Sequence, residues 1–172
     1  MALTLDGNGT MTVGNGDITG LVAGALPSTV IGAGAVLQVV NVKYNTTATS
    51  TSVGTTFDSG LTASITPSSA NNKILVLVSS NGVQLSGSSY GKVTLTDGSN
   101  NVLTIMLTPA GYTNSSDESV DSISTCFYHS PGSTSTQTYK VRGELSSGTA
   151  MAFQTSTGGN SESTITLMEI AA

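Results

Sequence analysis

Apolar side chains alternate with polar ones along most of this chain, in short segments that end at Gly, Pro, Asn or Asp. Because successive side chains of a β-strand point to opposite faces, this two-residue period predicts half-buried strands rather than helices. The segments recur at intervals of about ten residues, which is typical of proteins built from many short strands. The predicted strands are centred on Val36–Tyr44, Leu61–Ile65, Ile74–Val78, Val83–Leu85, Val93–Leu95, Leu103–Leu107, Ile123–Phe127, Tyr139–Leu145, Met151–Phe153 and Ile165–Leu167.

Three segments carry more specific predictions. Ile74–Val78 is apolar throughout, as a strand covered on both faces is. Asn81-Gly82 is a dipeptide typical of tight hairpins, so we predict a turn there before the strand that follows. In the first strand, four apolar side chains are predicted to share one face: Val36, Val40, Val42 and Tyr44.

The strand pattern predicts an all-β protein, folded as an antiparallel β-sandwich with an extended N-terminal arm. A jelly roll is the most common such architecture with eight strands. A Greek-key immunoglobulin-like sandwich is the alternative, but the chain has no Trp and a single Cys, so the Cys–Trp–Cys signature of that fold is missing.

The first 35 residues differ from the rest. Gly-Asn-Gly occurs at Gly7–Gly9 and again at Gly14–Gly16, which predicts short strands separated by tight turns. Such a segment has little to pack against within one chain, so we expect another subunit or partner to cover it. We divide the chain into an anchoring arm, residues 1–35, and a sandwich head, residues 36–172. The arm residues expected to make the anchoring contacts are Leu3, Leu5, Met11, Val13, Ile18 and Leu21.

The composition favours a homo-oligomer. Charged residues make up 9% of the chain, against about 25% in an average soluble protein. Small hydroxylated residues, 26 Ser and 27 Thr, take their place, and aromatic residues are only 5%. A thin core gains stability when exposed faces are buried in an assembly, and the centres of interfaces are poor in charge.

Several partner classes are disfavoured. With five Lys and Arg, a net charge of −5 and no basic cluster, the chain is not expected to bind nucleic acid. Leu21–Val40 is uncharged, but Gly, Pro27 and polar residues lower its hydropathy, so we expect no membrane span. No positively charged region precedes it, so we expect no secretory signal.

No pattern of catalytic residues is present, and we expect neither an enzyme nor a cofactor. His129 and Cys126 lie three residues apart, on opposite faces of a strand, so they cannot act as a pair. Two metal alternatives stay open: three His129 side chains meeting on a trimer axis, and the acidic residues Asp117, Glu118 and Asp121 holding Ca²⁺ within a Gly111–Ser122 loop. A strand-end histidine and a solvated acidic loop are the simpler interpretations.

Aromatic side chains offer one binding hypothesis, because an aromatic ring matches the apolar face of a sugar. Tyr112 is the best candidate, since it lies in a predicted loop two residues before Asn114. The other aromatic candidates, Tyr90, Tyr128 and Phe153, are as readily explained as core residues.

Several segments of the sequence resemble a group of bacteriophage virion proteins from marine and cyanobacterial phages, known as fibre, tail-fibre-like or capsid-decorating proteins. These segments are VLQVVNVK at Val36–Lys43, GLTASITPSS at Gly60–Ser69, NKILV at Asn72–Val76 and TITLMEI at Thr164–Ile170. DITGL at Asp17–Leu21, which leads into Ala25–Pro27, is similar to the stems that precede such domains.

The resemblance implies a homotrimeric β-sandwich on the virion surface, docked through its arm to phage capsid or tail proteins. The short arm favours a capsid fibre or decoration knob over a tail fibre or tail-tip receptor-binding protein, which is the alternative. Outward loops, Gly111–Ser122 and Ser130–Gln137, are expected to adhere weakly to host surface polysaccharide through Tyr112 and Asn114. A free carbohydrate-binding module is the alternative from another class.

Overall fold

The structure, a computed structural model, describes residues 4–5, 11–12, 32–87, 89–110, 117–155 and 161–172. The chain divides into two compact units, Met1–Gly32 and Ala33–Ala172. The first unit contains a short antiparallel pair, β1 (Thr4–Leu5) and β2 (Met11–Thr12). The division into an arm of residues 1–35 and a head of residues 36–172 stays a prediction.

The second unit is a β-sandwich, and among its described residues there is no helix. The all-β, antiparallel prediction is therefore confirmed. The strands of this unit are β3 (Val36–Tyr44), β4 (Ala48–Ser50), β5 (Thr56–Ile65), β6 (Lys73–Ser86), β7 (Tyr90–Asp97), β8 (Val102–Ala110), β9 (Asp117–His129), β10 (Gln137–Ser147), β11 (Ala150–Phe153) and β12 (Ser163–Ile170).

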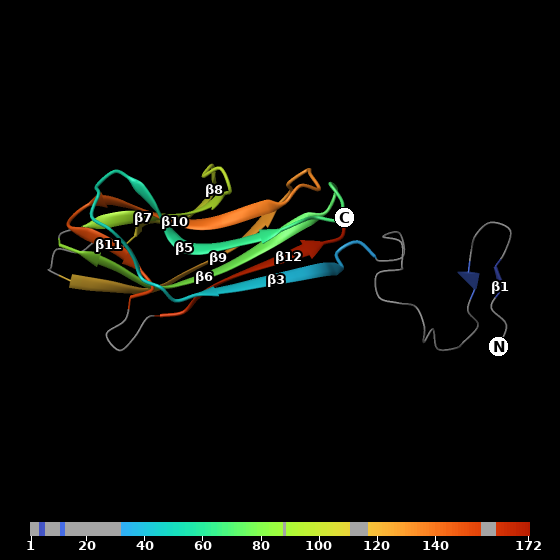
Figure 1. Ribbon diagram of the computed structural model, residues 1–172, viewed down its shortest axis with the longest axis horizontal. Coiled ribbons are helices and arrows are strands. Elements are labelled where there is room, and N and C mark those ends of the chain that lie inside the picture. The colour runs from blue at the N-terminus through green and yellow to red at the C-terminus, as the bar shows by residue number, and fades with distance from the viewer. Residues whose placement is uncertain (1–3, 6–10, 13–31, 88, 111–116, 156–160) are drawn as a thin grey trace. The chain divides into compact units, whose positions relative to one another are not determined.

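Two antiparallel sheets form the layers (Figure 1). The smaller has the order β5-β10-β7-β8. In the larger, β6 pairs with β9 along one side, and with β12 and then β11 along the other. Strands β3 and β4 complete this sheet beyond β12 and β11.

The strand pairs are nested along the chain. The first strand of the sandwich, β3, pairs with the last, β12; then β4 pairs with β11, β5 with β10, β6 with β9, and β7 with β8. At the centre of this nest, the turn between β7 and β8 is closed by Asp97, whose carboxylate accepts hydrogen bonds from the backbone of Ser99 and Asn101. The sandwich is thus one long antiparallel hairpin folded over on itself.

The core lies between the sheets and follows the predicted alternation. On β10, for example, Tyr139, Val141 and Leu145 are buried while their neighbours are not. Most of the predicted inward residues of the other strands are also buried, among them Leu61, Ala63, Ile65, Val93, Leu95, Ile123, Met151, Phe153, Ile165 and Leu167. The alternation predicted for Leu103–Leu107 is wrong in this respect, because Ile105 is 52% exposed and Leu103 and Leu107 are only half-buried. The pairing of β8 with β7 shifts register at several points, and each shift changes which face a side chain occupies.

Two further strand predictions are corrected. Asn81-Gly82 does not form a hairpin, because β6 runs through it and stays paired with β9 on both sides. Gly82 has φ +60°, and a Cβ at this position would collide with the backbone of Thr155. The Thr155 backbone passes close to Gly82, and its N–H donates to the Gly82 carbonyl oxygen. Glycine is required at this crossing rather than at a turn.

Val36 does not share the inner face with Val40, Val42 and Tyr44. The pairing of β3 with β12 shifts by one residue near Val36, and its side chain is 53% exposed. A shift of one residue reverses which face a side chain occupies.

Ile74–Val78 is covered on one face by the sandwich itself. Ile74, Val76 and Val78 are buried, whereas Leu75 and Leu77 lie half-buried on the outer face of the larger sheet.

Gly143, on the inner face of β10, leaves room for the contact between the rings of Phe57 and Phe153. The rings of Phe57 and Phe153 lie 5.6 Å apart, centroid to centroid, at an interplanar angle of 56°. A Cβ on Gly143 would lie 2.6 Å from the Phe153 ring and 2.9 Å from that of Phe57. The rings of Phe57 and Phe153 therefore occupy the space that a side chain at position 143 would fill.

We expect Gly143→Ala to lower the free energy of unfolding by about 1–3 kcal/mol, because the added methyl forces both rings from their positions. Urea unfolding followed by circular dichroism measures it. Gly32→Ala is the control, since nothing lies within 4 Å of a Cβ there. Equal midpoints for Gly143→Ala and the unsubstituted protein would show that the rings do not pack on Gly143.

Candidate functional site

Of the predicted anchoring residues, the structure describes two. Leu5 on β1 and Met11 on β2 are register partners in the antiparallel pair of the first unit. Leu3, Val13, Ile18 and Leu21 lie outside the described residues.

The predicted glycan-contact residues Tyr112 and Asn114 also lie outside the described residues. The predicted loop is corrected at its C-terminal end: β9 begins at Asp117, so positions 117–122 belong to a strand that pairs with β6. A long partner strand explains the difference, because β6 continues to Ser86 instead of turning at Asn81-Gly82.

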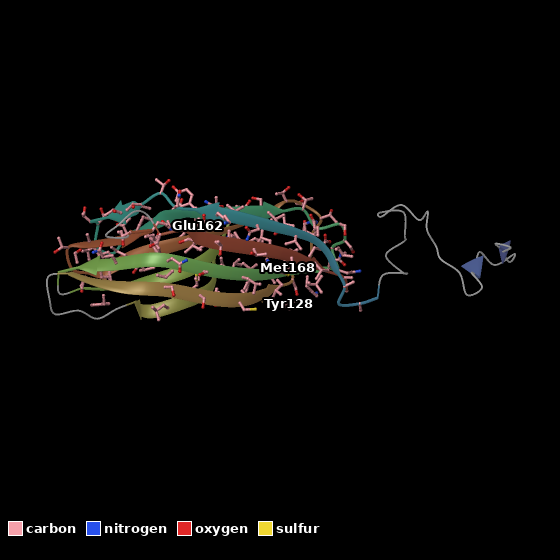
Figure 2. All side chains as sticks on the ribbon, turned by 90° about the horizontal axis from the view of Figure 1, so that it is seen from below. Tyr128, Glu162 and Met168 are labelled. Carbon is pink, nitrogen blue, oxygen red and sulfur yellow. The ribbon has the colours of Figure 1, made fainter. Side chains whose placement is uncertain are left out.

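The other aromatic candidates fall into two groups. Phe153 is fully buried against Phe57, as the core interpretation predicts. Tyr90 and Tyr128 are exposed, with Tyr128 at 58% on the outer face of the larger sheet. Figure 2 looks onto that face, with Tyr128 labelled on β9.

His129 belongs to a small network inside the sandwich. Its Nδ1 lies 2.8 Å from the hydroxyl of Tyr139, and its ring stacks on Phe127 with centroids 5.9 Å apart. Burial lowers the pKa of His129, and the charge of Asp97 opposes this only in part. Burial also raises the pKa of Tyr139, so its O–H keeps the proton. This O–H donates to Nδ1 in the tautomer of His129 that carries its hydrogen on Nε2.

Cys126 lies on the opposite face of β9 from His129, as predicted, and is exposed. The two side chains therefore cannot form a nucleophile–base pair within one chain. Among the residues that the structure describes, no three His, Cys, Asp or Glu side chains gather at one point.

Glu169 is a buried carboxylate that the sequence interpretation missed. It lies on the inner face of β12 and is fully buried. One oxygen accepts hydrogen bonds from Gln38 Nε2 at 2.6 Å; the other accepts from Asn72 Nδ2 at 2.6 Å and from the backbone and hydroxyl of Ser68 at 2.7 and 2.8 Å. Four donors thus replace the water that this carboxylate loses.

The hydrogen bonds decide the charge state of Glu169. Burial by itself raises the pKa of the carboxyl, but the donors on Asn72, Gln38 and Ser68 outweigh burial, and the pKa is lowered. Because Ser68 and Asn72 belong to the turn between β5 and β6, Glu169 fastens that turn to β12. The signal that could have found it is a Glu at an inward position of the alternating segment Thr164–Ile170.

Charged side chains gather on the outer face of the smaller sheet. Arg142 Nε donates to Asp58 at 2.7 Å, and Lys92 pairs with Glu144 at 2.8 Å. Lys140 donates to the side-chain oxygen of Asn100 at 3.0 Å. This face has the mixed charge of a surface that stays in contact with water.

A shallow polar depression lies at the β7–β8 turn. It is lined by Asp97, Gly98, Ser99 and residues 136–138, at the end of the predicted Ser130–Gln137 loop. The lining offers hydroxyl and amide groups and no aromatic side chain.

Comparison of the sequence with protein-family models and with the curated proteins gives no match in either case. In the part of the chain that the structure describes, no helix has the length and hydropathy needed to cross a membrane.

We expect Glu169→Gln to cost about 2 kcal/mol of folding free energy at pH 7, because an amide replaces an acceptor and leaves a buried donor unpaired. Since the folded-state pKa of Glu169 lies below its unfolded value, the stabilisation is complete above the unfolded pKa. It is lost as the pH falls through the folded pKa. The difference between the two proteins should therefore shrink in acid, as measured by urea unfolding from pH 7 to pH 3.

Glu162→Gln is the matched control, because that carboxylate is exposed and pairs with the exposed Lys43. Its effect should stay below about 0.5 kcal/mol at every pH. A Glu169→Gln difference that is constant with pH would mean that Glu169 is already protonated in the folded protein.

Proposed function

We propose that this chain is a structural protein of a bacteriophage particle: a homotrimeric short fibre or decoration knob on the capsid surface, anchored by its N-terminal arm. The proposal starts from the resemblance of four segments of the sequence to phage fibre and decoration proteins. A β-rich, charge-poor chain suits a structural role, which requires a stable assembly and no catalytic residues.

The nested strand pairing is the observation that carries the proposal. We assign the sandwich to the jelly-roll type, in which eight strands form two four-stranded sheets through two Greek keys. The order β3-β12-β6-β9 in one sheet and β5-β10-β7-β8 in the other supports this assignment, with β4 and β11 as an added outer pair. Viral capsid proteins and lectins are among the proteins with this fold, and by analogy of fold alone it supports a virion or glycan-binding role.

The arm supplies the attachment in this proposal. Within the described residues, β1 and β2 pair only with each other, which leaves each strand one unpaired edge. Such an edge can add to a sheet of another protein through backbone hydrogen bonds. Leu5 and Met11 then place apolar side chains against the shell, together with the predicted contacts Leu3, Val13, Ile18 and Leu21.

Adhesion to host polysaccharide is a further part of the proposal. The polar depression at the β7–β8 turn adds hydroxyl and amide donors to the loop residues Tyr112 and Asn114 as candidate sugar contacts. The three linked copies of one trimer would strengthen weak binding through avidity. If the assembled protein binds no surface polysaccharide of the host at high concentration, adhesion is excluded and the decorating role remains.

Light scattering behind size exclusion tests the assembly. We expect the full chain to show about three times the 17.2 kDa mass of one copy. A chain beginning at Ala33 keeps the hydrogen bonds of Gly34 and Ala35 to Ala171, and we expect it to be a trimer as well. Monomers in both cases would contradict the fibre proposal.

Immunogold electron microscopy tests the location. Antibody against the sandwich should decorate the capsid of phage particles that encode this chain. Label on the tail alone would favour the tail-fibre alternative, and unlabelled particles would favour a free carbohydrate-binding module. Particles stripped of the protein should rebind the full chain but not the chain beginning at Ala33.

A further inference from the structure

An apolar row crosses the outer face of the larger sheet. Val39 on β3 is the register partner of Met168 on β12, Met168 of Leu75 on β6, and Leu75 of Tyr128 on β9. Val39 is 55% exposed, and Met168 and Leu75 are half-buried. Figure 2 shows these four strands side by side, with Met168 and Tyr128 labelled. We call these four side chains the apolar row.

On one side, the neighbouring positions widen the apolar row without adding charge. In the next register line, Asn41, Thr166, Leu77 and Cys126 follow one another across the same strands. The polar members satisfy each other, because Asn41 donates to the Thr166 hydroxyl at 2.7 Å. On the other side of Met168, Ile170 extends the face, and its register partner Lys73 marks the edge of the uncharged region.

The two outer faces of the sandwich therefore differ in kind. Three of the five cations of the chain, Lys92, Lys140 and Arg142, lie on the smaller sheet with Asp58 and Glu144 between them. On the larger sheet, the described charges nearest the apolar row are Lys73, beside Ile170, and Lys43, which pairs with Glu162. Among the described side chains, those at the centre of the larger sheet can be dried without removing ions from water, whereas those at the centre of the smaller sheet cannot.

The occupant that fits this face is a second copy of the chain. Each copy carries a net charge of −5, so copies repel unless the surfaces that meet are uncharged. A continuous apolar run such as Ile74–Val78 is typical of a strand covered on both faces, and here the sandwich covers only one of them. We propose that copies of this chain meet through the outer face of the larger sheet, with the apolar row at the centre of the contact. This rests on the proposed homotrimer and adds the surface that forms it.

Val39→Glu tests the interface, with Val102→Glu as its matched control. Val39 and Val102 are 55% and 58% exposed, and Val102 lies on β8 of the smaller sheet. A carboxylate at the centre of the contact must be desolvated without a partner, so we expect Val39→Glu to weaken assembly at least about 100-fold. Light scattering over a dilution series of the full chain measures it. Val102→Glu should assemble like the unsubstituted protein.

Cys126 provides a second readout that requires no substitution in the interface. It is exposed in a single copy and lies in the register line beside the apolar row. In the assembled protein we expect a thiol reagent to modify it slowly. In folded Val39→Glu it should react at the rate of an exposed thiol. Circular dichroism and melting temperature establish that both variants fold.

The outcomes separate this inference from the proposed function. An assembled Val39→Glu protein with a freely reactive Cys126 overturns the inference and leaves the trimer in place. A native protein that is monomeric at every concentration overturns both. A slowly reacting Cys126 that becomes reactive when residues 1–32 are removed, with no change in the number of copies, would mean that the arm covers the face, which also overturns the inference.

Discussion

The register of β6 is the constraint on which the sandwich depends. This strand pairs with β9 along one side and with β12 and β11 along the other, so three further strands take their positions from it. Because side chains alternate with a period of two, a slip of one residue would exchange Ile74, Val76 and Val78 with Leu75 and Leu77. The inner face would then lose its β-branched packing, and every strand paired to β6 would have to shift with it.

Buried polar groups secure the same register at the end of the sandwich. Glu169 takes hydrogen bonds from Gln38 on β3 and from Ser68 and Asn72 in the turn before β6. A misaligned β12 would leave this carboxylate buried without donors, which is among the most costly errors that a core can contain. The network therefore penalises wrong pairings more than it adds to the stability of the right one.

The sequence predicted what depends on nearby residues. Alternation along Tyr139–Leu145 and Leu61–Ile65 identified buried faces, because a side chain's face follows from its neighbours two positions away. The hairpin predicted at Asn81-Gly82 was wrong, because the dipeptide is a local signal, whereas the pairing of β6 with β9 joins residues far apart in the chain. Glu169 was missed for the same reason: its donors Gln38 and Asn72 lie far away in the chain. The exposed row on the larger sheet needed the register of four strands, which no local pattern contains.

The nested pairing has a consequence for how the protein is made. The innermost pair, β7 and β8, closes over a short turn, and each pair outside it adds strands that are further apart in the chain. Closing short loops first keeps the entropy cost of each later pairing small, so we expect zippering from β7–β8 outward. The partner of β3 is β12, the strand of the sandwich that is synthesised last. Until β12 is made, β3 and one edge of β6 stay unpaired, so the outer face of the larger sheet is complete only when the whole sandwich has been synthesised.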